Sequence, residues 1–140
     1  MSMIRSDKRR PVPASLEANG GKTALVVNDH GPIHKTVLRV LRRGGYRILE
    51  ASGALHAKRL ADSHRNIRLV LADSSAPKTS GLALARWFKA RFPQTMILLT
   101  TASLWELLLQ TGERERFGIL VKPFGADELK RMVRGLAASV

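Results

Sequence analysis

The residues of this chain that could do chemistry together are an amide, two carboxylates, a hydroxyl and an ammonium group. They are Asn28, Asp29, Asp73, Thr101 and Lys122. Two carboxylates attract a hard divalent cation, and Mg²⁺ prefers one or two carboxylates completed by water and phosphate oxygens. With a cation, a hydroxyl and an ammonium group around it, Asp73 could carry a phosphoryl group. The cation would offset its charge, while Lys122 and Thr101 would bind its oxygens.

Each of these residues stands at or just after the end of a short apolar segment. Such segments are typical of strands buried on both faces, and the amphipathic stretches between them are typical of helices. The predicted strands are 24–27, 46–49, 67–72, 96–99 and 117–121, and the predicted helices are 32–43, 54–64, 82–92, 103–110 and 127–136. The alternation predicts an α/β fold with a five-stranded parallel sheet, doubly wound by right-handed crossovers. The carboxyl ends of parallel strands share one edge, which would bring the polar residues together.

Taken singly, each of these residues has a simpler explanation. An aspartate at the end of a strand more often caps the next helix, and a threonine there reflects strand propensity. A lone lysine is usually surface charge. The prediction of a shared site therefore depends on the order of these residues and on their common edge.

Four stretches of the chain carry a resemblance to a known family. They read VVNDHGP, LVLADSSAPKTSG, PQTMILLTTAS and LVKPFGADEL, in that order along the chain. From Thr23 onward the chain resembles the receiver domain of bacterial two-component response regulators. The resemblance implies a flavodoxin-like fold of strand order 2-1-3-4-5. It also implies a single receiver domain over 23–140. Residues 1–22 are rich in charged residues, Pro, Gly and Ser and show no apolar period, which predicts a flexible basic tail.

The resemblance also implies roles around a metal. Asp73 would be the phosphoacceptor and would receive its phosphoryl group from a histidine kinase or a phosphotransfer protein. Mg²⁺ would be the cofactor, bound by the carboxylates of Asp29 and Asp73 and by the backbone carbonyl of Ser75. Asn28 would reach the metal through a water molecule.

Two further roles implied by the resemblance concern the phosphoryl oxygens, and a third feature concerns the backbone after Lys122. Thr101 would be the switch hydroxyl, and Lys122 would pair with the phosphoryl group. The peptide bond between Lys122 and Pro123 is expected to be cis, which a proline permits at modest cost.

Two positions depart from the pattern of the family. Asn28 stands where the family usually has an acid, and an amide brings no charge, so Mg²⁺ binding is expected to be weaker. Ile119 stands where the family often has an aromatic residue that rotates with the switch hydroxyl, so switching would depend on shifts of helices and loops. These departures leave a second interpretation open, a pseudo-receiver that acts as an interaction module with little phosphorylation.

The charge balance is strongly basic. The chain holds 24 Lys and Arg residues against 11 Asp and Glu residues, a formal net charge of +13. Residues 1–22 contribute five basic and two acidic residues of these. Such a surface attracts polyanions or acidic proteins, so a basic nucleic-acid-binding protein is a third interpretation, less favoured than the receiver.

The chain has no cysteine, which excludes disulfides and thiolate metal sites. No segment approaches the ~18 apolar residues of a membrane span, and the first residues lack the apolar core of a secretion signal. These observations predict a cytoplasmic protein with no membrane partner. Met1 and the short end after the last predicted helix lead to the expectation of a complete chain.

The predicted helix at 103–110 is too apolar for one buried face. Leu104, Trp105, Leu107, Leu108 and Leu109 cannot all point inward. A wide core stripe would explain some of them. The other interpretation is an interface with a partner protein or a second copy of the chain, formed by Leu104, Trp105 and Leu108.

The sequence therefore predicts a single-domain response regulator that signals by an altered protein–protein contact once Asp73 is phosphorylated. It would catalyse its own phosphoryl transfer and is not expected to be an enzyme in the ordinary sense. Its cognate kinase and its downstream target do not follow from the residues.

Overall fold

The computed structural model of the chain describes residues 21–27, 31, 33–74, 81–112, 115 and 117–138. Nearly all of the predicted basic tail lies outside these residues. Across the described residues, no helix combines the length and the apolarity that crossing a membrane requires.

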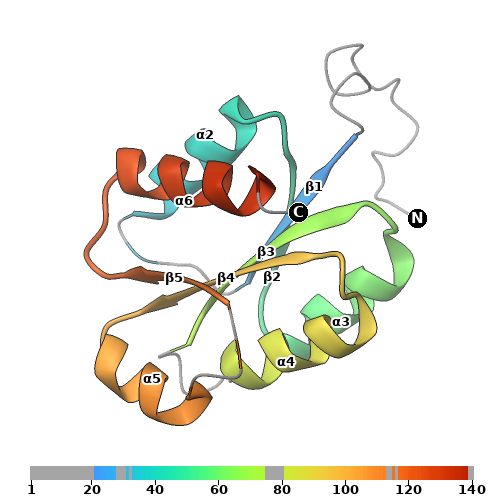
Figure 1. The fold of residues 1–140 in the computed structure, drawn as a ribbon. Coiled ribbons are helices and arrows are strands. Elements are labelled where there is room, and N and C mark those ends of the chain that lie inside the picture. The colour runs from blue at the N-terminus through green and yellow to red at the C-terminus, as the bar shows by residue number, and fades with distance from the viewer. Residues whose placement is uncertain are drawn as a thin grey trace.

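A parallel sheet built from the apolar segments forms the centre of the described part. Its strands are β1 (Thr23–Val27), β2 (Arg47–Ala51), β3 (Ile67–Asp73), β4 (Met96–Thr101) and β5 (Gly118–Val121). They lie in the order β2-β1-β3-β4-β5, with every neighbouring pair parallel (Figure 1). This order confirms the predicted flavodoxin-like fold.

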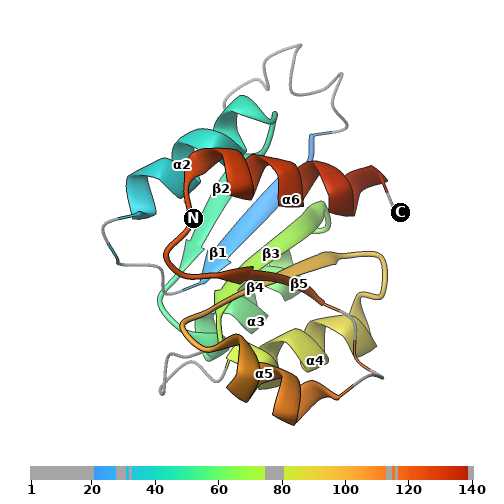
Figure 2. The same cartoon turned by 60° about the vertical axis from the view of Figure 1, so that its left-hand side comes forward.

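Helices cover both faces of the sheet. They are α2 (His34–Arg43), α3 (Ala54–Ser63), α4 (Gly81–Arg91), α5 (Leu104–Thr111) and α6 (Ala126–Ala138). Helices α2 and α6 lie on one face, and α3, α4 and α5 lie on the other (Figures 1 and 2). Each helix follows a strand and runs back across the sheet. It therefore begins near the carboxyl ends of the strands and ends near their amino ends. We call these two sides of the sheet the carboxyl edge and the amino edge.

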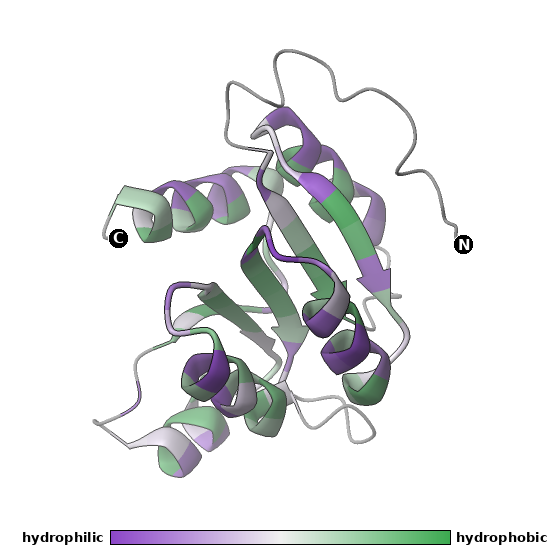
Figure 3. Ribbon diagram, turned by 90° about the vertical axis from the view of Figure 1, so that its right-hand side faces the viewer, coloured by the Kyte–Doolittle hydropathy of each residue, from purple (hydrophilic) through white to green (hydrophobic). Residues whose placement is uncertain are grey.

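An apolar core lies on each face of the sheet. The strands are mostly hydrophobic, whereas the helices alternate between hydrophobic and hydrophilic residues (Figure 3). All of β1 is buried, Phe88 of α4 is fully buried on one face, and Leu129 of α6 is fully buried on the other. Burying a side chain of this size stabilises the fold by about 1.5–3 kcal/mol. The cores hold the sheet rigid, and the sheet in turn fixes the residues at its edges.

The end of α2 sets the start of β2. Tyr46, predicted to open that strand, instead closes the helix, because its backbone N–H donates to the carbonyl of Leu41 at 3.1 Å. Gly45 has φ 91°, in the left-handed region where glycine costs least. The strand therefore begins at Arg47, one residue later than predicted.

Candidate functional site

The carboxyl edge of the sheet collects polar residues from neighbouring strands. Asp73 ends β3, Thr101 ends β4, and Lys122 directly follows β5. In the sheet register Asp73 lies opposite Thr100. Strand β3 is the central strand of the sheet and borders β1, where the strand order reverses. Parallel α/β folds bind ligands beyond the carboxyl ends of their strands at such a switch point.

Lys122 forms an ion pair with Asp73. Its ammonium nitrogen Nζ lies 2.6 Å from Oδ2 of Asp73, a short charge-assisted hydrogen bond. The side chains are 36% and 19% exposed, respectively, so the pair is partly shielded from water but remains open to a ligand. A negative group added to Asp73 would find a cation already within reach.

The backbone around Lys122 fixes where its side chain begins. Its N–H donates to the carbonyl of Thr101 at 2.8 Å, which extends the pairing of β4 and β5 by one residue. The peptide bond between Lys122 and Pro123 is cis, the isomer that the resemblance implies. Phe124 is then buried in the core shared with α2 and α6. The backbone is therefore fixed at Lys122 by its hydrogen bond to Thr101 and just after it by the buried side chain of Phe124.

The backbone after Asp73 is also fixed. Ser74 donates to the carbonyl of Thr100 from its N–H at 2.8 Å and from its hydroxyl at 3.0 Å. Helix α4 begins at Gly81 directly against this segment. A Cβ atom at Gly81 would lie 2.8 Å from the carbonyl carbon of Asp73 and 2.9 Å from Cα of Ser74. Only glycine therefore allows α4 to start so close to the end of β3.

A small hollow lies beside the ion pair. Its volume is about 10 Å³, which is room for at most one water molecule. The residues that line it are Val27, Leu71, Ala72, Asp73, Thr100, Lys122 and Phe124. A phosphoryl group does not fit inside this hollow.

The two threonines at the end of β4 differ in their surroundings. The Thr101 hydroxyl accepts from the Ser103 N–H at 3.0 Å and also lies 3.0 Å from the Ser103 carbonyl, to which it donates. Thr100 instead lines the hollow beside Asp73. Sequence reasoning did not assign Thr100 to the site. The sequence does carry a signal for Thr100, because side chains alternate along a strand. Alternation places Thr100 on the same face of the sheet as Leu98, and Asp73 on the same face as Leu71, and both leucines belong to the core under α2 and α6.

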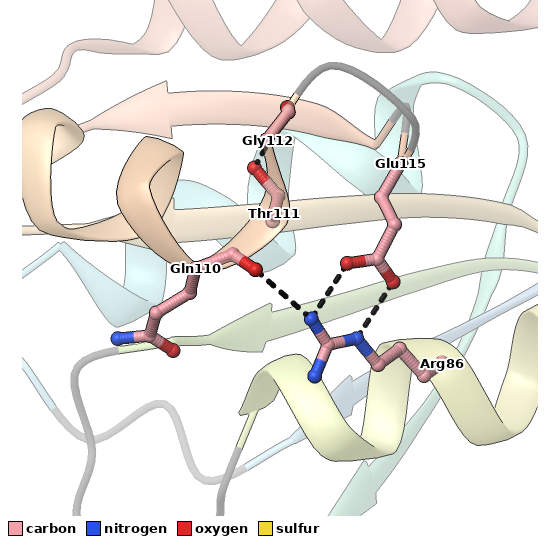
Figure 4. Close-up of polar contacts among 5 residues, drawn as sticks. All are labelled: Arg86, Gln110, Thr111, Gly112 and Glu115. Carbon is pink, nitrogen blue, oxygen red and sulfur yellow. Dashed lines mark hydrogen bonds and ion pairs between the residues drawn. The ribbon is translucent and has the colours of Figure 1, made fainter.

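A cluster of polar contacts ties the end of α5 to α4 (Figure 4). Arg86 of α4 donates to both carboxylate oxygens of Glu115 at 2.6 Å and to the carbonyl of Gln110 at 3.2 Å. The hydrogen bond with Arg86 lowers the pKa of the Glu115 carboxyl, and the same bond raises the pKa of Arg86. This clamp fixes the far end of the helix that follows Thr101.

Helix α5 exposes much of its apolar surface. Leu107 is buried, whereas Trp105 is 71% exposed and Leu109 is 68% exposed. Leu104 and Leu108 are exposed to a lesser degree. The predicted interface residues on this helix are therefore accessible, and whether a partner covers them stays a prediction.

The predicted metal ligands other than Asp73 lie outside the described residues. These are Asp29, Asn28 and Ser75. Asn28 and Asp29 directly follow Val27 in the chain. Val27 pairs with Ala72, the residue before Asp73. Among the described residues, no group of three or more His, Asp or Glu side chains could hold a metal. The ligand set therefore stays a prediction.

A comparison with protein families matches residues 24–134 to the response regulator receiver domain. Among curated proteins, the chain is 33% identical over 112 residues to the phosphate regulon transcriptional regulatory protein PhoB of Pseudomonas aeruginosa. That match covers 78% of this chain and 48% of PhoB, so the chain spans about half the length of this relative.

Solved structures of the same fold include a response regulator receiver domain protein from Clostridium thermocellum. It is 22% identical with a TM-score of 0.72, covering 84% of this chain and 95% of that chain. The chemotaxis response regulator CheY4 of Vibrio cholerae is 23% identical with a TM-score of 0.70. That match covers 82% of this chain and 98% of CheY4.

Proposed function

The chain belongs to the family of response regulator receiver domains of two-component systems, and on that premise we propose that it accepts a phosphoryl group on Asp73. The donor would be a histidine kinase or a phosphotransfer protein. The observation that carries the proposal is the ion pair between Asp73 and Lys122 at the carboxyl edge of the sheet. In the receiver pattern these two positions hold the acceptor carboxylate and the lysine that pairs with the phosphoryl group.

In the transfer, a carboxylate oxygen of Asp73 attacks the phosphorus atom. The bond from phosphorus to the donor's histidine nitrogen breaks as the new P–O bond forms, and the imidazole leaves with the electron pair and takes up a proton. Lys122 exchanges its contact with Oδ2 of Asp73 for an oxygen of the phosphoryl group. Because Lys122 is already in place, little reorganisation is needed as negative charge arrives.

The oxygen ligands proposed around Asp73 fit Mg²⁺. Asp29, Asp73 and the Ser75 carbonyl are hard oxygen donors, and Asn28 would act through water. The partial exposure of Asp73 supports this fit, because Mg²⁺ keeps several water ligands. When bound, the cation would offset the charge of the phosphoryl oxygens.

Signalling would follow from a change in protein contact near α5. The Thr101 hydroxyl would turn from Ser103 toward the phosphoryl group, and the turn that it holds at the start of α5 would loosen. Helix α5 carries Trp105 and Leu109, both largely exposed. A partner protein that reads the position of this helix would then bind one state better than the other.

The test is to add acetyl phosphate and Mg²⁺ to the purified chain and to follow its intact mass. We expect a gain equal to one phosphoryl group, lost when Mg²⁺ is chelated. Asp73→Asn is the matched control, because it keeps the shape of the side chain and removes the nucleophile. A gain that persists in Asp73→Asn would place the phosphoryl group elsewhere.

A second candidate function is a pseudo-receiver that binds partners without phosphorylation. The observation that favours it is Asn28, an amide at a position where the family usually has an acid. The variant Asn28→Asp separates the two functions. If the native chain gains no mass at millimolar Mg²⁺ while Asn28→Asp does, the pseudo-receiver is the better description.

A further inference from the structure

The charges of the described residues are divided between the two edges of the sheet. Helices α2 and α4 carry basic residues in their last turns, and α5 and α6 carry acidic residues in their first turns. Since every helix ends at the amino edge, basic residues accumulate there, on the side of the sheet opposite Asp73. The amino-edge cations are Lys22, Arg42, Arg43, Arg47, Arg65, Arg68, Lys89, Arg91, Lys130 and Arg134, which we call the basic pole.

Two cavities open within the basic pole. One, of about 360 Å³, lies between the ends of α2 and α6 and is bordered by Lys22, Arg43, Lys130 and Arg134. The other, of about 280 Å³, lies between the ends of α3 and α4 and is bordered by His64, Arg65, Arg68 and Arg91. No acidic residue borders either cavity among the described residues.

The two cavities lie close together. Tyr46 forms part of the first cavity, with the Lys22 ammonium 4.6 Å from the centre of its ring. The backbone joins the two cavities at the amino edge. The N–H of Thr23, next to Lys22 of the first cavity, donates at 2.9 Å to the carbonyl of Asn66, which stands between Arg65 and Ile67 of the second cavity. The cations of both cavities therefore lie along the same edge of the sheet.

Among the residues that the structure describes, most cations of the basic pole have no carboxylate partner. Two described acids lie near this edge, and each is held by an arginine: Asp62 by Arg91 at 3.2 Å and Glu115 by Arg86 at 2.6 Å. Within the described residues, no ion pair engages Arg43, Arg65 or Arg134. Unpaired cations at this density repel one another, and a polyanion would relieve that repulsion.

From these observations we propose that the basic pole binds the phosphate backbone of a nucleic acid, independently of its base sequence. Seven of the ten cations are arginines, whose planar guanidinium groups bind phosphate oxygens in pairs. Of the described aromatic residues that border the cavities, Tyr46 and Phe88 are buried and Phe92 is half-buried, so the cavities present mainly charge to a nucleic acid. The contacts are therefore with phosphates, which give affinity and no sequence preference.

An anionic membrane is the competing polyanion. Peripheral membrane binding normally adds inserted apolar side chains to the charge. The large exposed apolar residues, which include Leu55, Trp105 and Leu109, border neither cavity. Binding to the phosphates of a nucleic acid needs charge alone, so a nucleic acid fits the basic pole better than a membrane does.

The test measures binding of a labelled double-stranded DNA to the full chain by fluorescence anisotropy between 50 and 200 mM salt. The pole variant is Arg65→Glu with Arg134→Glu, one change beside each cavity. The control variant is Lys35→Glu with Arg131→Glu, both exposed and beside neither cavity. The two variants lose the same net charge. A second pole variant, Arg43→Gln with Arg68→Gln, removes charge without reversing it.

We expect the native chain to bind two unrelated DNA sequences equally and with a steep salt dependence. Both pole variants should weaken binding about tenfold or more, and the salt slope should fall by about 2 for two lost phosphate contacts. The control should change binding less than about threefold. Equal losses in pole and control variants would overturn the proposal, as would tighter binding to phosphatidylserine vesicles or to polyglutamate than to DNA.

Discussion

Nζ of Lys122 lies 2.6 Å from Oδ2 of Asp73, although the two residues stand 49 positions apart in the chain. The contact forms because β3 and β5 both end at the carboxyl edge, with β4 between them. It places a cation beside the proposed acceptor before any phosphoryl group arrives. The pair is therefore the first feature to test.

Replacing Lys122 with methionine should slow phosphorylation of Asp73 by about tenfold to a hundredfold. A hydrogen bond to a charged group contributes about 1.5–3 kcal/mol, and each 1.4 kcal/mol is a factor of ten. The free energy of unfolding should change by less than about 1 kcal/mol, because the pair is partly exposed. Intact mass against time measures the rate, with Lys89→Met as the matched control. An unchanged rate in Lys122→Met would remove Lys122 from the mechanism.

Replacing Gly81 with alanine should destabilise the domain by about 1–3 kcal/mol. The added Cβ would meet the backbone of Asp73 and Ser74, which cannot move without disturbing the end of β3. Gly135 of α6 is the matched control, since nothing lies within 4 Å of a Cβ there. Gly135→Ala should stabilise the chain by about 0.5–1 kcal/mol, because alanine favours a helix over glycine. Urea unfolding measures both, and equal effects would mean that α4 can shift away from β3.

The order and type of the elements could be predicted because burial on both faces leaves a continuous apolar run in each strand. The ends of the elements were less predictable. Tyr46 looks like the start of a strand, yet it closes α2 through a hydrogen bond that depends on the left-handed backbone of Gly45. The start of β2 is thus set by the preference of glycine for a left-handed backbone, which the pattern of apolar residues does not reveal.

The residues at the ends of the strands could be predicted to lie together, and the contact of Asp73 with Lys122 follows from their shared edge. The position of Thr100 beside Asp73 depends in addition on which face of the sheet each threonine of β4 occupies. The basic pole depends on more distant relationships. Arg43 and Arg134 lie on helices that return to the amino edge, whereas Arg68 lies where β3 begins at that edge. The three stand far apart in sequence and come to one edge only when the chain folds.

Acidification should release the clamp at the end of α5. The hydrogen bond from Arg86 lowers the pKa of Glu115 in the folded chain. A carboxyl whose pKa is lower in the folded state stabilises the fold fully above its unfolded pKa, and this stabilisation is lost as the pH falls through the folded value. The Glu115 carboxyl resonance should therefore titrate below its ordinary range by NMR, and Arg86→Gln should return it toward that range.

Arg59→Gln is the control for the clamp, because Arg59 is exposed and forms no ion pair among the described residues. Hydrogen exchange supplies a second measurement. The Gly112 N–H donates to the Leu108 carbonyl at 2.9 Å in the last turn of α5. Its exchange should accelerate in Arg86→Gln and stay unchanged in Arg59→Gln. A Glu115 titration that is identical in all three proteins would mean that the clamp does not form in solution.

Replacing the threonines of β4 with valine should separate their roles. Thr101→Val leaves the N–H and carbonyl of Ser103 without their partner and should destabilise the chain by about 1–3 kcal/mol. It should still gain a phosphoryl group, because Asp73 and Lys122 are untouched. It should lose the conformational response, because no hydroxyl is left to leave Ser103 for the phosphoryl group.

The response is measured as a change in Trp105 fluorescence when beryllofluoride and Mg²⁺ are added. The chain has two tryptophans, so the measurement uses a Trp87→Phe background in which the signal comes from α5 alone. Thr100→Val is the matched control, since it changes the same group one residue earlier, and it should keep the response. If Thr100→Val abolishes the response and Thr101→Val preserves it, the switch hydroxyl is the one beside the hollow, and the link from Asp73 to α5 does not run through Ser103.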